Sequence, residues 1–374
     1  MYKTSGIRNS RIEVADALRG IAVIGIILYH SVEHFNMFAR SYTYTLPCDR
    51  GLFNTLNLLL SGKMYGIFAL LFGLSFFIMR DNQEQKGKDF SARFAWRMVL
   101  LFLFGMVNLL FYDGDILVSY AIFGLLMIPA GYLPNRVLWP ITIILLLQPL
   151  DFYTFITGKP VMDSALVWKY YGLVGDGHAG SFWASALADL KYGIQTNMAW
   201  NVYAGRITQI PGMFFLGILL GRRRLFYNEG NNLKIWRIVL AVSAVLGIAG
   251  TVIDLGAAGK WLDPIVGFSL MLVWVSGVVL LWYAFEGFRK ALSQICFFGR
   301  MSLTNYLLQS VIGSFLFYGF GLGLYNVLGT TYAFLVGIAM VLFQLGILRL
   351  WARNHERGPL ESLWRKLTWL DFSK

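Results

Sequence analysis

The sequence predicts an all-α integral membrane protein, a polytopic bundle of about ten transmembrane helices with both termini in the cytoplasm. Three observations predict this fold class. Hydrophobic residues make up 57% of the 374 positions and charged residues only 14%, whereas soluble chains average about 25% charge. Apolar runs of about twenty residues, the length that a helix needs to cross a bilayer, recur along the whole chain. Lysine and arginine are concentrated in alternate connections, which is the pattern of the positive-inside rule.

Ten segments have the length and apolarity of a spanning helix. In chain order they cover residues 14–31, 58–79, 94–111, 116–132, 137–155, 207–226, 235–253, 265–285, 301–320 and 332–350. The first run contains Asp16 and Arg19 and is followed by no small-residue cleavage site, so we expect a retained helix rather than a signal peptide. No linker, repeat or low-complexity tract separates the ten, which predicts a single domain over residues 1–374.

Basic residues set the predicted orientation of these helices. The connections on one side, together with both termini, carry 23 lysines and arginines, and those on the other side carry 8. The richer side is therefore predicted to be cytoplasmic. The net charge of +12 then indicates topology and contact with anionic lipid, and no nucleic-acid partner is expected.

Two stretches outside the predicted spans are long enough to fold. Residues 157–206 are predicted as an outward-facing loop insertion, which either caps an outward cavity or forms an interfacial pair of helices. Residues 351–374 include the run WRKLTWL, whose mixture of basic residues and tryptophan is typical of a helix lying on the inner surface. The two cysteines fall on opposite sides of the membrane, so neither a disulfide nor a cysteine metal site is predicted.

Charged side chains inside the first helix are the strongest functional candidates, because such charges are costly in lipid. Arg19 and His30 are eleven residues apart, close to three helical turns, which places them on one face about 16 Å apart along the axis. Asp16 lies one turn before Arg19 and can pair with it. Two structural alternatives remain open: an Asp16–Arg19 pair that anchors helix packing, and a hydrogen-bonded core histidine at position 30.

Acidic residues precede the fourth predicted helix, at the membrane level of His30. Asp113 and Asp115 occupy this short outward turn. A carboxylate that bonds one imidazole nitrogen fixes the tautomer and raises the basicity, as a general base requires. A helix N-cap is an equally good interpretation of Asp115. Lys63, at the outer start of the second helix, is either a site cation or a snorkelling interfacial residue.

A polar stripe follows the ninth predicted helix within the run GRMSLTNYLLQSVIGS. Its members, spaced at helical intervals, are Ser302, Asn305, Tyr306 and Gln309. Such a stripe either holds helices together or forms a hydrogen-bonding wall for a polar ligand that enters from the cytoplasm. In the second case Arg300 and the triple-arginine run 222–224 would receive phosphates, although a topology signal is the favoured interpretation of that run.

Five stretches of the sequence resemble the YeiB-like family of bacterial membrane proteins, whose C-terminal portion is a domain of unknown function. They are ADALRGIAVIGIIL, GKMYGIFALLFGLSFFI, GDILVSYAIFGLL, GRMSLTNYLLQSVIGSFLFYGFGLGLY and RGPLESLWRKLT. That family is similar to transmembrane acyltransferases, including the lysosomal heparan glucosaminide acetyltransferases and bacterial enzymes that modify surface sugars. The resemblance implies an acyltransferase-like domain in a bacterial inner membrane. Arg19 and His30 match the spacing in those bacterial enzymes of an arginine or lysine, ten residues and a histidine.

The leading hypothesis is therefore acyl transfer, with acetyl favoured, from cytoplasmic acyl-CoA to an acceptor at the outer face, a sugar being one candidate. His30 would be the base or a transient acyl carrier, and Asp115 or Asp113 would orient it. Arg19, paired with Asp16, would bind the polar part of the donor. The polar stripe of the ninth helix, with the arginine before it, would line the donor's path.

Two other functions remain open. A transporter or exporter of a small polar metabolite would use the same buried ions as a proton relay, and a sensor or scaffold would use no chemistry. Gly217 and Gly221 form a small-xxx-small pair, which serves either a homodimer or packing within one chain.

Overall fold

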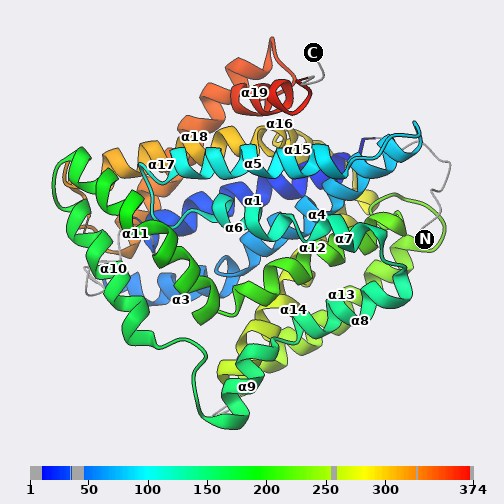
Figure 1. The fold of residues 1–374 in the computed structure, drawn as a ribbon, viewed down its shortest axis with the longest axis horizontal. Helices are drawn as coiled ribbons and strands as arrows, with labels where there is room; N and C mark the ends of the chain where they lie inside the picture. The colour runs from blue at the N-terminus through cyan, green and yellow to red at the C-terminus, as the bar shows by residue number, and fades with distance from the viewer. Residues whose placement is uncertain (1–10, 34, 36–45, 254–258, 326, 371–374) are drawn as a thin grey trace.

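The structure is a computed structural model that describes residues 11–33, 35, 46–253, 259–325 and 327–370. The regular elements within these ranges are α-helices, which confirms the all-α fold class (Figure 1). In chain order they are α1 (Glu13–Val32), α3 (Asp49–Leu59), α4 (Lys63–Glu84), α5 (Ser91–Asn108), α6 (Ile116–Gly124), α7 (Met127–Tyr132), α8 (Asn135–Leu146), α9 (Pro149–Thr157), α10 (Ser164–His178), α11 (Phe182–Tyr203), α12 (Arg206–Arg222), α13 (Asn232–Val252), α14 (Gly259–Ala284), α15 (Glu286–Ser293), α16 (Cys296–Arg300), α17 (Ser302–Phe317), α18 (Thr330–Ala352) and α19 (Pro359–Thr368).

All ten predicted segments fall on helices, but the helices differ in how well they suit a membrane. Among the described residues, five helices are long and apolar enough to cross one, or seven if each of two bent pairs counts as one span. The bent pairs are α8 with α9, at 47°, and α11 with α12, at 78°. The helix α17 has 16 residues, and the fourth predicted segment is divided between α6 and α7. The chain therefore has the architecture of a helical membrane protein, and ten crossings remain a prediction.

Exposed apolar side chains on α13 agree with this architecture. Val242, Val245, Leu246 and Ile248 are each more than half exposed. A contiguous apolar surface of this kind is rare on soluble monomers and marks contact with another apolar phase. Hydrocarbon is the phase that a helix of this length and composition fits.

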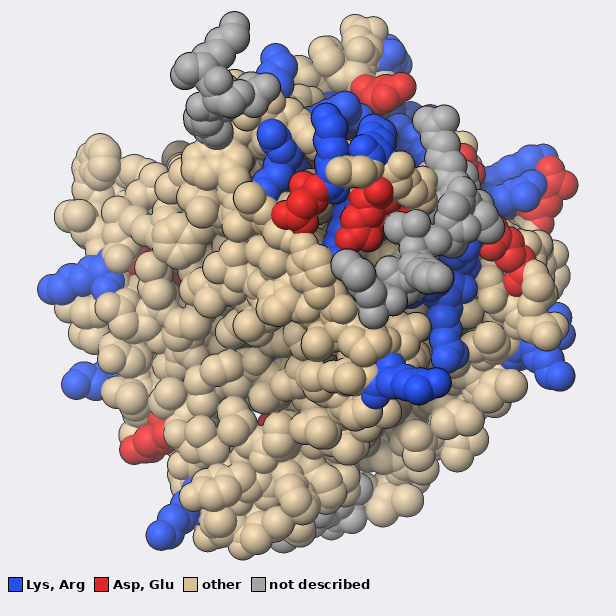
Figure 2. Space-filling model, turned by 45° about the vertical axis from the view of Figure 1, so that its right-hand side comes forward, with Lys and Arg blue, Asp and Glu red and all other residues tan. Residues whose placement is uncertain are grey.

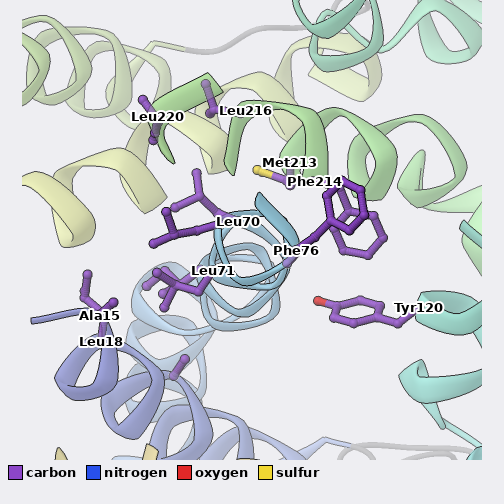
Figure 3. Close-up of a cluster of buried hydrophobic side chains, with 14 of the residues drawn as sticks. Ala15, Leu18, Leu70, Leu71, Phe76, Tyr120, Met213, Phe214, Leu216 and Leu220 are labelled. Atoms are coloured by element: carbon purple, nitrogen blue, oxygen red, sulfur yellow. The ribbon is translucent and has the colours of Figure 1, made fainter. Parts of the chain in front are cut away.

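The helix α4 lies at the centre of the bundle, between α1 and α12 (Figure 3). Leu70 and Leu71 of α4, Leu18 of α1 and Phe214 of α12 are fully buried in the same cluster. In Figure 3, Tyr120 of α6 points its hydroxyl oxygen toward α4, and this hydroxyl donates to the Tyr65 carbonyl at 2.9 Å. The core thus brings together segments that are far apart in the sequence.

The crossing of α4 and α12 is unusually close. A Cβ added to Gly217 would meet the Leu70 carbonyl oxygen, and one added to Gly73 would meet that of Phe214. Gly221 in turn faces the side chain of Phe77 on α4. Gly217 and Gly221 therefore pack against a helix of their own chain, which is the second interpretation of the predicted pair.

Residues 157–206, predicted as a loop insertion, form the helices α10 and α11, at the edge of the molecule opposite the N-terminal label in Figure 1. This stretch is largely helical, and α11 packs into the bundle. Asn201 donates to the Ser119 hydroxyl of α6 at 2.7 Å, and Asn197 donates to the Asp115 carbonyl. The helix α11 thus supplies part of the polar interior around the start of α6.

The predicted surface tail folds onto the bundle as α19, which contacts α5 and α17 (Figure 1). Trp364 is 8% exposed, and its indole nitrogen donates to the Arg97 carbonyl at 3.2 Å. The Arg97 guanidinium lies 3.5 Å from the centre of the Trp364 ring. Residues 1–10 of the predicted cytoplasmic N-terminus and residues 371–374 of the tail lie outside the described residues.

Candidate functional site

A cavity of about 940 Å³ opens at the end of the bundle where α1 begins and α19 is docked. Its described lining includes eight basic residues and three acidic ones. The basic residues are Arg11, Arg19, Lys86, Lys88, Arg97, Arg300, Arg357 and Arg365. In the view of Figure 2, most of the visible Lys and Arg side chains gather at the upper right, and a large area elsewhere on the surface carries no charge. The mouth of the cavity is therefore an anion-attracting surface.

The cavity changes from charged to apolar with depth. Along α4 its lining runs from Gln83, near the mouth, to Phe68, which is fifteen residues or about 22 Å of helix. The deep part is lined by Phe68, Phe72, Leu117, Tyr120 and Tyr306. A ligand that matches this lining has an anionic end and a long, less polar arm.

Arg19 is held at the mouth by two partners. Its guanidinium donates to the Asp16 carboxylate at 2.8 Å and to the Ser75 hydroxyl of α4 at 2.8 Å. Arg11 contacts the other oxygen of Asp16 at 2.9 Å. The predicted Asp16–Arg19 pair is present, and because two arginines share one carboxylate, the group keeps a net positive charge that faces the cavity.

His30 lies beyond the deep end, outside the described lining of the cavity. Its ring is 5.2 Å from that of Tyr112 and 6.5 Å from that of Tyr306, measured between centroids. The Nδ1 atom is 3.4 Å from the Gln309 side-chain nitrogen, while the Gln309 Oε1 atom is buried without a described hydrogen-bond partner. Because amide nitrogen and oxygen are interchangeable in assignment, a turned amide would accept from Nδ1–H and leave the lone pair on Nε2.

Asp115 has a structural role that competes with its predicted catalytic one. One carboxylate oxygen accepts from the Val118 main-chain nitrogen and the other from the Asn108 side chain, both at 2.9 Å. This is the N-cap of α6, so the N-cap interpretation is correct and the predicted bond to His30 is replaced by these two. Asp113 is 2% exposed in the same turn, and its part in orienting His30 remains a prediction.

The polar stripe of α17 divides between two surroundings. Ser302 and Tyr306 line the cavity, whereas Asn305 donates to the Phe298 carbonyl at 3.0 Å and Gln309 turns toward His30. Arg300, just before the helix, lines the mouth. The stripe therefore joins the cavity to the histidine, although Asn305 serves packing.

The triple-arginine run 222–224 lies outside the described lining of the cavity. Arg222 donates to the carbonyl oxygens of Gly131 and Leu133, at 2.6 and 2.8 Å. Arg224 pairs with Glu229 at 2.8 Å. These contacts give Arg222 and Arg224 local structural partners, and the interpretation of the run as a topology signal stays a prediction. Lys63 donates to the Asn57 carbonyl at 3.2 Å, at the end of the bundle away from the basic mouth.

Sequence reasoning missed the contribution of α19 to this site. The Glu361 carboxylate accepts from the main-chain nitrogens of Leu303 and Thr304, at 2.7 and 3.0 Å, and from the Thr304 hydroxyl at 2.6 Å. It thereby satisfies the free N–H groups at the start of α17, which a helix cannot bond by itself. The partners are 57 and 58 residues apart in the sequence, so no local pattern signals the contact.

Burial gives Glu361 a predictable pH dependence. Desolvation raises the pKa of its carboxyl above the ordinary value of 4.5, against the hydrogen bonds from Thr304 and Leu303. The folded state then holds the proton more tightly than the unfolded state, so this group adds stability as pH falls from the raised pKa toward 4.5. We therefore expect the melting temperature of the purified wild-type protein to rise, relative to that of Glu361→Gln, as pH falls through that interval. A difference between the two proteins that is constant with pH would contradict this.

A second buried histidine, which the sequence reasoning also missed, lies between α10 and α11. His178 of α10 and Asp189 of α11 are joined at 2.9 Å and buried, and the His178 ring stacks on Tyr318 at 3.9 Å. Nothing in the spacing of these residues singles them out, because α10 and α11 come together only in the folded insertion.

Comparison with known proteins shows which proteins this chain is similar to. A family model described as a protein of unknown function, DUF418, matches residues 220–371. The uncharacterized protein YxaH of Bacillus subtilis is 28% identical to this chain, over 97% of the chain and 96% of its own length. The uncharacterized protein YeiB of Escherichia coli is 27% identical, over 94% and 95%. The chain resembles these two proteins over nearly its whole length. An uncharacterized 39.9 kDa protein of Bacillus acidopullulyticus, 27% identical over 96% and 94%, extends this YeiB-like set.

The predicted resemblance is thus confirmed over nearly the whole length of the chain. The relatives are described without an activity, so they do not indicate a reaction. A reaction has to be inferred from the geometry of the site.

Proposed function

We propose that this protein moves an acyl group, with acetyl favoured, from cytoplasmic acyl-CoA to an acceptor hydroxyl or amine at the outer face of a bacterial inner membrane. The observation that carries the proposal is the cavity, whose basic mouth leads through an aromatic interior toward His30. Its volume of about 940 Å³ lies within the range of small-molecule sites, roughly 300–1,000 Å³.

The two ends of an acyl-CoA match the two ends of the cavity. Arginines at the mouth, Arg19 and Arg300 among them, would hold the nucleotide phosphates through charge-assisted hydrogen bonds. The pantetheine arm would pass Phe72 and Leu117 toward the deep end. The basic mouth also agrees with the proposed topology, in which ten crossings place both termini in the cytoplasm.

His30 would act as a general base. It takes the proton of the acceptor hydroxyl or amine, and the acceptor oxygen or nitrogen bonds to the thioester carbonyl carbon. The carbon–sulfur bond then breaks, and the imidazolium returns its proton to the thiolate, which leaves as CoA. With its amide turned, Gln309 would hold the tautomer that this sequence of steps requires.

Ligand-induced stabilisation tests the donor site. Acetyl-CoA at about 100 times its dissociation constant should stabilise the folded protein by about 2.7 kcal/mol. Arg19→Gln should weaken the response, whereas Arg223→Gln is a matched control, because its guanidinium lies over Trp139, 5.6 Å from the ring centre. The measurement is the melting temperature of detergent-purified protein against the concentration of acetyl-CoA or CoA.

A flat response to both ligands would overturn acyl transfer and favour the transporter alternative. An equal response from the two arginine variants would remove Arg19 from the donor site.

A further inference from the structure

The cavity and His30 are separated by one side chain that faces both. Tyr306 lines the deep end of the cavity, and its ring meets the His30 ring at 70°, with 6.5 Å between centroids. His30 itself contacts Tyr112 and Phe35 on its other sides. We propose that the Tyr306 ring is the partition between the donor cavity and His30, and that it keeps His30 apart from the thioester and from the water beside it until an acceptor is in place. This inference rests on the proposed acyl transfer.

The Tyr306 ring is fixed in this position. Its side chain is buried, and its hydroxyl oxygen accepts from the Ile116 main-chain nitrogen at 3.1 Å. That nitrogen belongs to the first turn of α6 and has no partner within its own helix. Moving the ring away would leave a partly buried main-chain donor without this bond, which is costly. The partition therefore stays closed unless something compensates for the lost bond.

Water is the reason that such a partition matters. The cavity opens at the basic end of the bundle, so solvent enters it freely, while a base beside a reactive thioester activates any hydroxyl within reach. With water as acceptor, His30 would take a proton from water and the water oxygen would bond to the carbonyl carbon. The carbon–sulfur bond would break and the thiolate would recover the proton, giving a free carboxylic acid and CoA. A closed Tyr306 ring prevents this loss.

The experiment needs no knowledge of the acceptor. Full-length protein in detergent or nanodiscs is incubated with acetyl-CoA alone, and CoA release is followed with a thiol reagent. Tyr306→Ala should hydrolyse acetyl-CoA at least about tenfold faster than wild type, a factor that corresponds to about 1.4 kcal/mol in the barrier. The double variant Tyr306→Ala, His30→Ala should lose this gain, because the base is absent.

Two further variants separate the partition from general loosening. Tyr306→Phe keeps the ring but loses the bond to the Ile116 main-chain nitrogen, so its rate of hydrolysis should lie between those of wild type and Tyr306→Ala. Tyr283→Ala is the control, because it removes a tyrosine outside the described lining of the cavity whose hydroxyl also donates to a main-chain carbonyl, that of Phe226 at 2.7 Å, and it should stay close to wild type.

The outcomes distinguish this inference from the proposed function. If Tyr306→Ala is still stabilised by acetyl-CoA but hydrolyses it no faster than wild type, the partition is wrong and acyl transfer stands. An equal rise in Tyr283→Ala would also overturn the partition. If wild type gains no stability from acetyl-CoA, the proposed function itself fails.

Discussion

His30→Ala is expected to lower acyl transfer by about 10²- to 10⁴-fold, which is the usual contribution of a positioned general base. His30 lies one ring beyond the deep end of the cavity, next to Tyr306, and Gln309 approaches its Nδ1 atom. Alanine would remove the proton acceptor and leave the mouth of the cavity, at the other end of α1, unchanged. The loss should therefore appear in the rate of transfer, while stabilisation by acetyl-CoA is retained.

The measurement is transfer of label from acetyl-CoA to endogenous acceptors in membranes that contain the protein. His355→Ala is the matched control, because this exposed histidine stacks on Trp351 at 4.0 Å, outside the described lining of the cavity. Full transfer by His30→Ala would remove the histidine from the mechanism. A loss of acetyl-CoA binding together with transfer would instead assign His30 to donor binding or to folding.

The fold class could be predicted from the sequence because hydrocarbon imposes a length and a composition on each helix. Every predicted segment overlaps one helix or two consecutive helices. What could not be predicted is which helices bend. Gln148 and Gly205, each with positive φ, lie at the α8–α9 and α11–α12 junctions. A hydropathy profile carries no information on backbone angles, so it does not predict these bends.

The candidate site could be predicted where its members share one helix. Asp16, Arg19 and His30 follow from helical periodicity, and the Asp16–Arg19 pair forms as expected. Glu361 could not be predicted, because its partners on α17 are brought to it only by the docking of α19. Asp115 had two interpretations that the sequence left equal, and Asn108, seven residues earlier, supports its role as the N-cap by occupying the second oxygen.

The second large effect concerns the crossing of α4 and α12. Gly217→Ala is expected to destabilise the protein by about 1–3 kcal/mol, because an added methyl group overpacks a contact with no room to adjust. The atoms that the new Cβ would meet include the Leu70 carbonyl oxygen and the Leu74 main-chain nitrogen, and a rigid helix cannot move them without separating from its neighbour. Small residues at helix crossings have this function in membranes, where close backbone contact replaces hydrophobic burial as the attraction between helices.

The same substitution at Gly277 should have the opposite sign. Gly277 lies within α14, and a Cβ there would meet nothing within 4 Å, so alanine brings its helix propensity, worth about 1 kcal/mol over glycine, without a clash. Reversible unfolding in mixed micelles would compare the two variants with wild type. Equal stability of Gly217→Ala and Gly277→Ala would mean that α4 and α12 lie too far apart for the added methyl group to clash.

The crossing of α4 and α12 should also affect the donor site. Because α4 carries Ser75 and Phe72 on the cavity wall, a shift of α4 should weaken the stabilisation of Gly217→Ala by acetyl-CoA. This effect would link the packing contact to the donor site.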